Sequence, residues 1–332
     1  MATKFVGENL SCVKWVPLSN SVLDRASRCI TVGRGSKTKT VSLWECSTEK
    51  IKLISKVPLS SNGTGLAFMS HKSFVTGGDD FDNQSLQVWS ITGDDLEEGG
   101  TLKTRNKLTT CVASTEKLVA SVGEEGHLQV HIPTQPRPVY SAKCEMCLNT
   151  CAFYLSHSVL VGSAAGQVHC FDTRQQGDTP ASTMSSELVS ILGIAVHTTQ
   201  PFIVANSRSD GSLLIWDMRN NRYPLATFAG HASAIWEVQF EKEKSDNLYT
   251  CSEDGQLLMW NGAALSGVGG LLGGGGKVSP WLTPEISHQK MDVFNLLGSD
   301  NKLSINSFDV LQGKVVCGGA RQTLFCTDSC DE

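Results

Sequence analysis

The stretch IWEVQFEKEKSDNLYTCSEDGQLLMWN (235–261) decides the fold. Three apolar segments within it, IWEVQF (235–240), LYTCS (248–252) and QLLMW (256–260), are separated by a charged loop and by the tight turn Glu253-Asp254-Gly255. Apolar runs of this length, bounded by polar or glycine-containing turns, are typical of antiparallel strands. The stretch therefore predicts a three-stranded unit that ends at Trp260.

Units of the same kind recur along the chain, and each ends in a segment with one marker side chain, an aromatic residue or histidine. The steps between successive markers are 45, 42, 40, 45, 44 and 65 residues. Five of these six steps match the period of about 40–45 residues that is typical of one four-stranded propeller blade. The markers are Trp44, Trp89, His131, Phe171, Trp216, Trp260 and Phe325. The sequence therefore predicts an all-β, seven-bladed β-propeller that forms one domain over residues 1–332.

The two ends of the chain predict how the ring closes. The last unit has three apparent strands, at 303–310, 314–319 and 322–327, and no segment after them for a fourth. The segment TKFVGE (3–8) precedes the first unit and has no partner there. We expect this segment to form the outer strand of blade seven, because the pairing would cover two open strand edges.

Composition excludes several function classes. The formal net charge is −5, and there is no long run of Lys or Arg to neutralise the phosphates of a nucleic acid. No apolar run approaches the roughly 18–20 residues of a membrane-spanning helix, and the start MATKFVGENL lacks an apolar signal core. The 12 cysteines fall mostly in apolar strand patterns, so we expect buried, reduced thiols. No cofactor, nucleic-acid partner or membrane insertion is predicted.

A glycine-rich insertion separates the sixth and seventh units. It covers residues 262–300 and opens with GAALSGVGGLLGGGG (262–276). Trp281 lies in it between two prolines, where we expect it to have little blade core to fill. Partner hot spots favour Trp, Tyr and Arg, so the candidate partner-binding residues are Trp281, Arg208 and Tyr223. A widened turn in blade two, from Asp79 to Gln84, is a second irregularity.

Four polar or aromatic residues of blade six have the spacing of the hydrogen-bonded tetrad of WD-repeat proteins. They are His231, Ser252, Asp254 and Trp260, with Ser252 expected to connect the indole to the imidazole. In blade five, Arg208 stands where the tetrad serine is expected. A hydrolase that uses Ser252 and His231 is the alternative, but no G-x-S-x-G turn surrounds Ser252. The structural interpretation is therefore favoured.

The chain contains three other patterns that occur in functional sites. Cys144, Cys147 and Cys151 form C-x2-C-x3-C, for which His157 or His169 is the available fourth zinc ligand. Without a second C-x-x-C pair, we favour ordinary thiols and no metal. An acidic connection, at 94–98, is interpreted as a solvated loop between blades two and three. Finally, FDTR (171–174) and WDMR (216–219) resemble the WDxR pairs of receptors that dock onto cullin-type ubiquitin ligase adaptors, through Arg174 and Arg219. Such short matches also occur as structural pairs.

Several longer stretches resemble the small WD-repeat nucleoporins of the Y-shaped scaffold complex. They are KFVGENLSCVKWVPL (4–18), VGEEGHLQVH (122–131), IWEVQFEKEKSDNLYTCSEDGQLLMWN (235–261) and LSINSFDVLQGKVVCGGARQTLFCT (303–327). The resemblance covers nearly the whole chain. It implies a non-enzymatic scaffold of the outer ring of the nuclear pore complex, attached to an α-solenoid nucleoporin. It also implies roles in pore assembly, mRNA export and protein transport, and a place at kinetochores in mitosis. The alternative is a substrate receptor of a cullin-type ubiquitin ligase.

Overall fold

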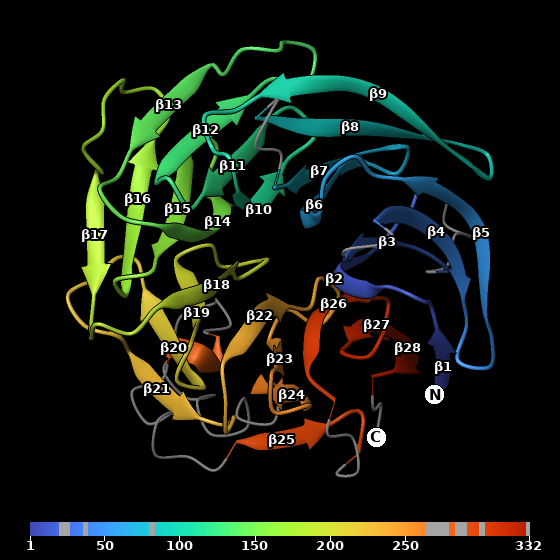
Figure 1. The fold of residues 1–332 in the computed structure, drawn as a ribbon. Coiled ribbons are helices and arrows are strands. Elements are labelled where there is room, and N and C mark those ends of the chain that lie inside the picture. Colours follow the sequence, from blue (N-terminus) through green and yellow to red (C-terminus); the bar gives the residue numbers. More distant parts are fainter. Residues whose placement is uncertain are drawn as a thin grey trace.

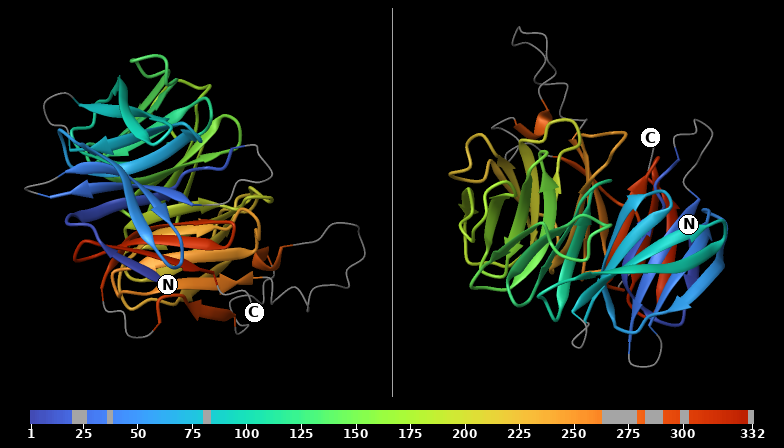
Figure 2. Two further views of the ribbon diagram at one scale, coloured as in Figure 1. Left: turned by 90° about the vertical axis from the view of Figure 1, so that its right-hand side faces the viewer. Right: turned by 90° about the horizontal axis from the view of Figure 1, so that it is seen from above.

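The computed structural model is a seven-bladed β-propeller, as predicted. It describes residues 1–19, 27–35, 39–79, 84–262, 279–282, 291–298 and 303–329. The strands form seven four-stranded antiparallel sheets that follow one another around a central axis (Figure 1). Figure 2 shows the ring edge-on, with the strands running between its two faces. The described residues contain no helix with the length and hydropathy of a membrane span.

The first four blades use consecutive strands, with the innermost strand first. Blade one contains β2 (Asn9–Trp15), β3 (Arg28–Arg34), β4 (Thr40–Cys46) and β5 (Ile51–Pro58). Blade two contains β6 (Gly63–Ser70), β7 (Ser73–Gly78), β8 (Ser85–Thr92) and β9 (Asp95–Lys103). Blade three contains β10 (Thr109–Ser114), β11 (Val119–Gly123), β12 (His127–His131) and β13 (Tyr140–Lys143). Blade four contains β14 (Leu148–Tyr154), β15 (Ser158–Ser163), β16 (Gln167–Asp172) and β17 (Ser182–Ser185).

Blades five and six follow the same order. Blade five contains β18 (Ile191–Val196), β19 (Ile203–Arg208), β20 (Ser212–Asp217) and β21 (Ala226–Ala229). Blade six contains β22 (Ile235–Phe240), β23 (Asn247–Ser252), β24 (Leu257–Asn261) and β25 (Asp292–Asn295), with the short 3-10 helix η2 (Pro280–Leu282) between its last two strands.

Blade seven is built from both ends of the chain. Its inner three strands are β26 (Ile305–Leu311), β27 (Lys314–Gly319) and β28 (Thr323–Asp328), and its outer strand is β1 (Ala2–Phe5). The antiparallel register runs from Ala2 opposite Cys326 to Phe5 opposite Thr323. The predicted closure of the ring by the N-terminal strand is therefore correct (Figure 1).

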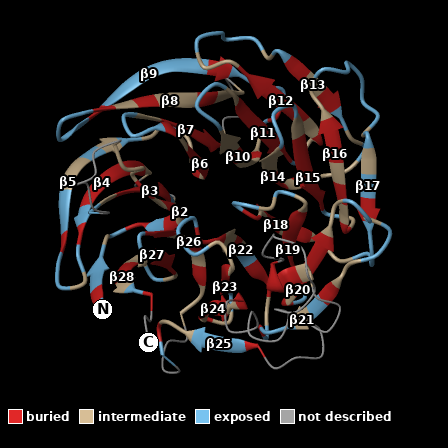
Figure 3. Cartoon of the chain, turned by 180° about the vertical axis from the view of Figure 1, so that it is seen from behind, coloured by how far each residue is buried: buried red, intermediate tan, exposed pale blue. Residues whose placement is uncertain are grey.

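The hydrophobic core is divided among the blade interfaces. Buried apolar side chains of the described residues form seven clusters, and each cluster joins two neighbouring blades. Figure 3 shows that burial is concentrated in the middle of each blade, as in the second strands β19 and β23, whereas long outer strands such as β5 and β9 are largely exposed. Each sheet is covered on both faces by neighbouring blades, which explains why its middle strands are apolar at consecutive positions.

Tight turns between the second and third strands bring blades three, four and five against the next blade, at Gly126, Gly166 and Gly211. Gly211 has φ +83°, a conformation that favours glycine. A Cβ at Gly211 would also collide with the carbonyl oxygen of His231 in blade six. Glycine therefore lets the backbones of blades five and six approach closely at this turn.

Three sequence-based assignments need correction. Residues 95–98 are not a loop, because they belong to the outer strand β9, whose exposed face tolerates charged side chains. The interval 262–300 is not only a connection, since β25 within it pairs with β24. Phe325, the predicted marker of blade seven, does not occupy the position that Trp260 has in blade six. Thr327 occupies it, because Thr327 pairs with Val315 as Trp260 pairs with Leu248. The turn residues 80–83 and most of the insertion lie outside the described residues.

Candidate functional site

A chain of hydrogen bonds crosses the inner part of blade six. The Trp260 indole N–H donates to Thr250 Oγ1 at 2.9 Å, and the Thr250 hydroxyl lies 2.8 Å from His231 Nε2. The other nitrogen of the same imidazole, His231 Nδ1, lies 3.0 Å from Asp254 Oδ2. The predicted members His231, Asp254 and Trp260 are therefore brought together.

Ser252 is not the connecting hydroxyl, and Thr250 takes that role. The Ser252 hydroxyl instead donates to the carbonyl of Ser233 at 3.1 Å and accepts the backbone N–H of Asp254. Strand geometry explains the error: Thr250 and Ser252 share a face of β23, but Thr250 lies beside the indole, whereas Ser252 is at the turn. Among the described residues, Ser252 and His231 form no serine–histidine pair of the kind a hydrolase needs.

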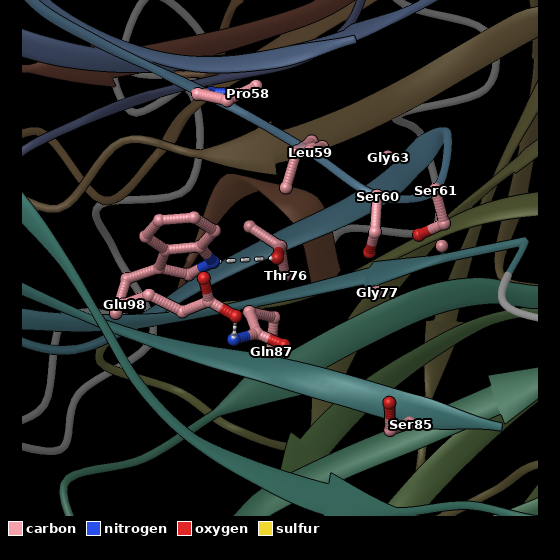
Figure 4. A pocket seen from close by; sticks show the side chains of 12 residues that line it. Pro58, Leu59, Ser60, Ser61, Gly63, Thr76, Gly77, Ser85, Gln87 and Glu98 are labelled. Atoms are coloured by element: carbon pink, nitrogen blue, oxygen red, sulfur yellow. Dashed lines mark hydrogen bonds between the residues drawn. The ribbon is translucent and has the colours of Figure 1, made fainter. Parts of the chain in front are cut away.

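The indole-to-threonine hydrogen bond also occurs in blades one and two. Trp44 Nε1 donates to Thr31 at 2.8 Å, and Trp89 Nε1 donates to Thr76 at 3.0 Å. Thr76, Gln87 and Glu98 line a small pocket of 170 Å³ (Figure 4), in which the Gln87 side chain donates to Glu98. Trp89 belongs to the same lining. The indole-to-threonine bonds tie the third strand of a blade to its second strand. The small pocket next to them is therefore part of the blade framework.

In blade five, salt bridges of a buried arginine take the place of the histidine-centred hydrogen bonds of blade six. Arg208 is buried, and its guanidinium contacts Glu187 at 2.7 Å and Asp210 at 3.3 Å. Glu187 precedes β18 as His231 precedes β22, so an arginine–glutamate pair stands where blade six has its histidine. Arg208 was predicted as a partner contact. A partner contact requires an exposed residue, but Arg208 is 2% exposed and already forms salt bridges within the chain.

Trp281 is also a core residue. Its side chain is fully buried between blades five and six, with its ring at right angles to Phe228 and nearly so to Phe240. Its indole N–H donates to the Asp246 carbonyl at 2.9 Å, and Gly262 N donates to the same oxygen. The expectation that Trp281 had little core to fill is therefore wrong. By contrast Tyr223, the third predicted contact, is 73% exposed.

The two arginines of the WDxR-like segments are paired locally. Arg174 forms a forked salt bridge with Asp172, with a shortest contact of 2.6 Å, and Arg219 does the same with Asp217 at 2.7 Å. The Arg219 guanidinium also stacks 4.0 Å from the centre of the Phe202 ring. Each aspartate has a lowered pKa because its own arginine donates to it. These arginines serve as blade-end structure here.

The cysteines of the C-x2-C-x3-C pattern are dispersed. Cys151 is buried in β14, where its thiol lies 3.9 Å from the Ala120 carbonyl, and Cys147 contacts Asn149. His169 is engaged with Thr183 at 3.0 Å. Among the residues that the structure describes, no three His, Cys, Asp or Glu side chains could hold a metal ion together.

The inner strands surround a central cavity of 830 Å³. The pairing of each inner strand is displaced after one residue near its start, which is Leu10, Gly63, Thr109, Leu148, Ile191, Ile235 or Ile305. Such a displacement is typical of a β-bulge, which re-aims one side chain. The bulged residues all line the cavity, and together they are called the bulge ring: Ser11, Thr64, Thr110, Asn149, Leu192, Trp236 and Asn306.

Four members of the bulge ring fasten neighbouring blades. The side chains of Thr64, Thr110, Asn149 and Asn306 each donate to the carbonyl of the residue just before the bulge in the inner strand of the next blade. The acceptors are Thr109, Leu148, Ile191 and Leu10 respectively. One of these bonds, from Asn306 to Leu10, crosses the seam between blades seven and one.

The bulge ring is apolar at blades five and six. Leu192 is half-buried, and Trp236 is 39% exposed although it faces the cavity. Sequence reasoning missed this pair because it read 235–240 only as a strand. Aligning the seven inner strands on the residue before each bulge places Leu192 and Trp236 beside Ser, Thr and Asn.

A denser polar network joins blades six, seven and one across the cavity wall. Lys14 donates to Glu237 at 3.0 Å and to the Phe308 carbonyl at 2.8 Å. Glu237 in turn accepts from Ser307, and Asp309 accepts from Trp15 N and from Gln239. Burial lowers the pKa of Lys14, but Glu237 and Asp309 raise it by more, so the net pKa lies above its usual value. The ammonium group is therefore held charged at the seam.

Comparison with known proteins agrees with this architecture. The family model described as WD domain, G-beta repeat matches residues 222–261, which span most of blade six. The WD40 β-propeller domain of Doa1 superposes with a TM-score of 0.70 at 16% identity, covering 98% of this chain and 95% of that one. This likeness concerns the fold alone.

Sequence relatives are more specific. Nucleoporin Nup43 of Homo sapiens is 24% identical over 98% of this chain and 97% of its own length. The chain resembles the WD-repeat nucleoporins. Nup43 of Mus musculus is 25% identical with the same coverage, and nup43 of Dictyostelium discoideum is 25% identical over 62% of this chain and 50% of its own length. The resemblance predicted from the sequence is confirmed.

Proposed function

We propose that this protein is a non-enzymatic scaffold subunit of the nuclear pore complex. The observation that carries the proposal is the similarity to two nucleoporins over 98% of the chain, so that the likeness is not confined to one repeat. The polar residues that suggested chemistry support the same conclusion. His231, Asp254, Arg174 and Arg219 are all occupied by structural bonds within their own blades.

The proposal extends to a specific subcomplex of the pore, a partner and cellular roles. We place the protein in the Y-shaped outer-ring complex, bound to an α-solenoid nucleoporin, with roles in pore assembly, mRNA export and protein transport. We also expect it at kinetochores in mitosis. What supports this assignment is the resemblance of the chain to the WD-repeat nucleoporins of that complex.

Two exposed aromatic side chains are proposed as contacts for the solenoid partner. Tyr223, predicted from the sequence, lies between β20 and β21. Trp236 lies at the apolar part of the bulge ring. Trp and Tyr dominate binding hot spots because they bury a large area at a small cost in side-chain entropy.

Imaging of a fluorescent fusion, expressed at native level in the organism of origin, tests the proposal. We expect a punctate signal at the nuclear rim in interphase, and at kinetochores in mitosis. A diffuse signal without rim enrichment would contradict the scaffold assignment. Rim signal without kinetochore signal would contradict only the mitotic role.

A further inference from the structure

Two cysteines on neighbouring inner strands lie side by side in the wall of the central cavity. Cys111 is on β10 of blade three and Cys151 is on β14 of blade four. The Cys111 sulfur is 3.8 Å from the Cys151 carbonyl oxygen, and the Cys151 sulfur is 4.0 Å from the Cys111 carbonyl oxygen. Because each sulfur approaches the backbone of the other residue, the two residues directly face each other across the blade interface.

The two thiols differ in environment. Cys111 is half-buried, and it is approached by the Thr150 hydroxyl at 3.9 Å. Donation by the Cys151 thiol, together with that hydroxyl, lowers the pKa of Cys111 to about 7, although burial opposes the shift. Cys151 is buried, and its pKa is raised well above the usual value by its bond to Cys111 and by burial. One member of the pair is therefore poised as thiolate and the other as thiol.

A third cysteine supplies an internal comparison. Cys12 lines the same cavity, at the inner-strand position equivalent to Cys111, and its sulfur contacts the Thr64 carbonyl at 3.3 Å. Burial raises the pKa of Cys12 to about 12. Cys12 thus lines the same cavity, but it is buried, and its surroundings do not favour a thiolate.

We propose that Cys111 is an oxidation site for small peroxides that enter the central cavity, and that Cys151 resolves the oxidised sulfur into a disulfide between blades three and four. The Cys111 thiolate attacks one oxygen of hydrogen peroxide, the O–O bond breaks, and hydroxide leaves. Sulfur is thereby oxidised to sulfenic acid, while the peroxide is reduced. The Cys151 thiol then attacks that sulfur, an S–S bond forms, the S–O bond breaks, and water leaves with the thiol proton.

Alkylation of the wild-type protein tests the reactivity of Cys111. The intact, reduced chain is treated with iodoacetamide at neutral pH, and modified peptides are quantified by mass spectrometry. Cys111 should react at least about tenfold faster than Cys12, because the thiolate is the nucleophile. Equal rates for Cys111 and Cys12 would overturn the proposal, and this comparison needs no variant.

Oxidation tests the role of Cys151. Hydrogen peroxide should yield a Cys111–Cys151 linked peptide in the wild type, and none in Cys111→Ser. In Cys151→Ser, the Cys111 sulfenic acid should persist and be trapped by dimedone. The variant Cys147→Ser, which alters a half-buried cysteine outside the pair, should still form the link. Absence of the link in folded wild-type protein, or trapping of the sulfenic acid there as readily as in Cys151→Ser, would overturn the proposal.

Discussion

Thr250 is the hydrogen-bonding hub of blade six. Its hydroxyl accepts from the Trp260 indole and lies 2.8 Å from His231 Nε2. The ionised Asp254 carboxylate can only accept, so the proton of the neutral imidazole is on Nδ1, and Nε2 accepts from the Thr250 hydroxyl. Asp254 thus determines the tautomer of the histidine, and Thr250 links the histidine to the third strand.

Removal of this hydroxyl should destabilise the protein. Thr250→Val keeps the shape of the side chain but leaves the buried indole and imidazole unpaired, at a cost of about 2 kcal/mol in the free energy of unfolding. Urea unfolding measures the change, with Thr227→Val as control, because Thr227 is exposed on β21. A larger loss in Ser252→Ala than in Thr250→Val would show that the hub is assigned to the wrong residue.

Protonation of His231 should also weaken the fold. Burial lowers its pKa, and Asp254 only partly offsets this. The unfolded chain, with an ordinary histidine pKa of about 6.5, therefore takes up a proton at higher pH than the folded chain does. The contribution of His231 is thus complete above that value and is lost as pH falls below it.

Thermal unfolding between about pH 7 and about pH 5 checks this sign. We expect Tm to fall across this range in the wild type, and to fall less in His231→Gln. Part of the decrease should remain in the variant, because burial also lowers the pKa of His127, His131 and His169. An identical decrease in both proteins would contradict the assignment of the shift to His231.

Sequence reasoning succeeded at the residue scale where spacing is unique and failed where burial decides. His231, Asp254 and Trp260 have fixed offsets from the turn, so their grouping was predictable. Thr250 and Ser252 are both hydroxyl residues at alternate positions of one strand, and only the three-dimensional register distinguishes them. Trp281 was misjudged because a Gly- and Pro-rich context suggests exposure, whereas the chain returns here to fill the space between Phe228 and Phe240.

Strand β1 is the element on which closure of the ring depends. It pairs with β28 along its whole length, and Ala2 is buried in the cluster between blades seven and one. The element could be predicted because one unpaired strand at the start matched one missing strand at the end. By contrast β9 was missed, because an exposed outer strand carries the charges that are typical of a loop.

A truncation that begins at Gly7 removes β1 together with Val6, whose N–H donates to the Gln322 carbonyl, and tests their joint contribution. Glu8 must remain, because it binds Thr40 and Lys56 of blade one. We expect a loss of roughly 3 kcal/mol in unfolding free energy, together with a tendency to aggregate, since backbone pairing is lost and the edge of β28 is exposed. The full-length Phe5→Ala variant, which alters an exposed side chain without removing the pairing, should be nearly unchanged. An unchanged Tm of the truncated chain would contradict closure by β1.

The polar network on the inner strands makes a second contribution to closure. Lys14 joins β2 to both β22 and β26 through Glu237 and the Phe308 carbonyl. Lys14→Met should lower the unfolding free energy by about 1–3 kcal/mol, because Glu237 loses its charged partner while it remains partly buried. Lys52→Met, on the exposed strand β5, is the matched control for the loss of one positive charge. Equal stability of the two variants would show that the network does not hold blade seven in place.

At the scale of the whole molecule, the ring has approximate sevenfold repetition but one distinct sector. Five members of the bulge ring are polar, whereas Leu192 and Trp236 are adjacent and apolar. Each of the seven apolar clusters joins two neighbouring blades, whereas the Lys14–Glu237 salt bridge joins blades one and six across blade seven. A single distinct sector is what recognition of one partner in one orientation requires.

Substitution of Trp236 should therefore affect binding rather than folding. Trp236→Ala is expected to weaken capture of pore subunits by about 2 kcal/mol in binding free energy, or roughly thirtyfold in Kd. Leu155→Ala removes a similarly exposed apolar side chain at the opposite end of an inner strand, and should bind normally. Titration of the purified variants with the captured partner measures both values. Unchanged affinity of Trp236→Ala would place the partner elsewhere, with Tyr223→Ala as the next test.

The measurement that tests the scaffold assignment most directly is affinity purification of the native-level tagged chain, followed by quantitative mass spectrometry. We predict recovery of outer-ring nuclear pore subunits, an α-solenoid nucleoporin among them, at levels comparable with the tagged chain itself. Recovery of cullin adaptors in place of pore subunits would contradict the account and favour a ubiquitin-ligase receptor that uses Arg174 and Arg219.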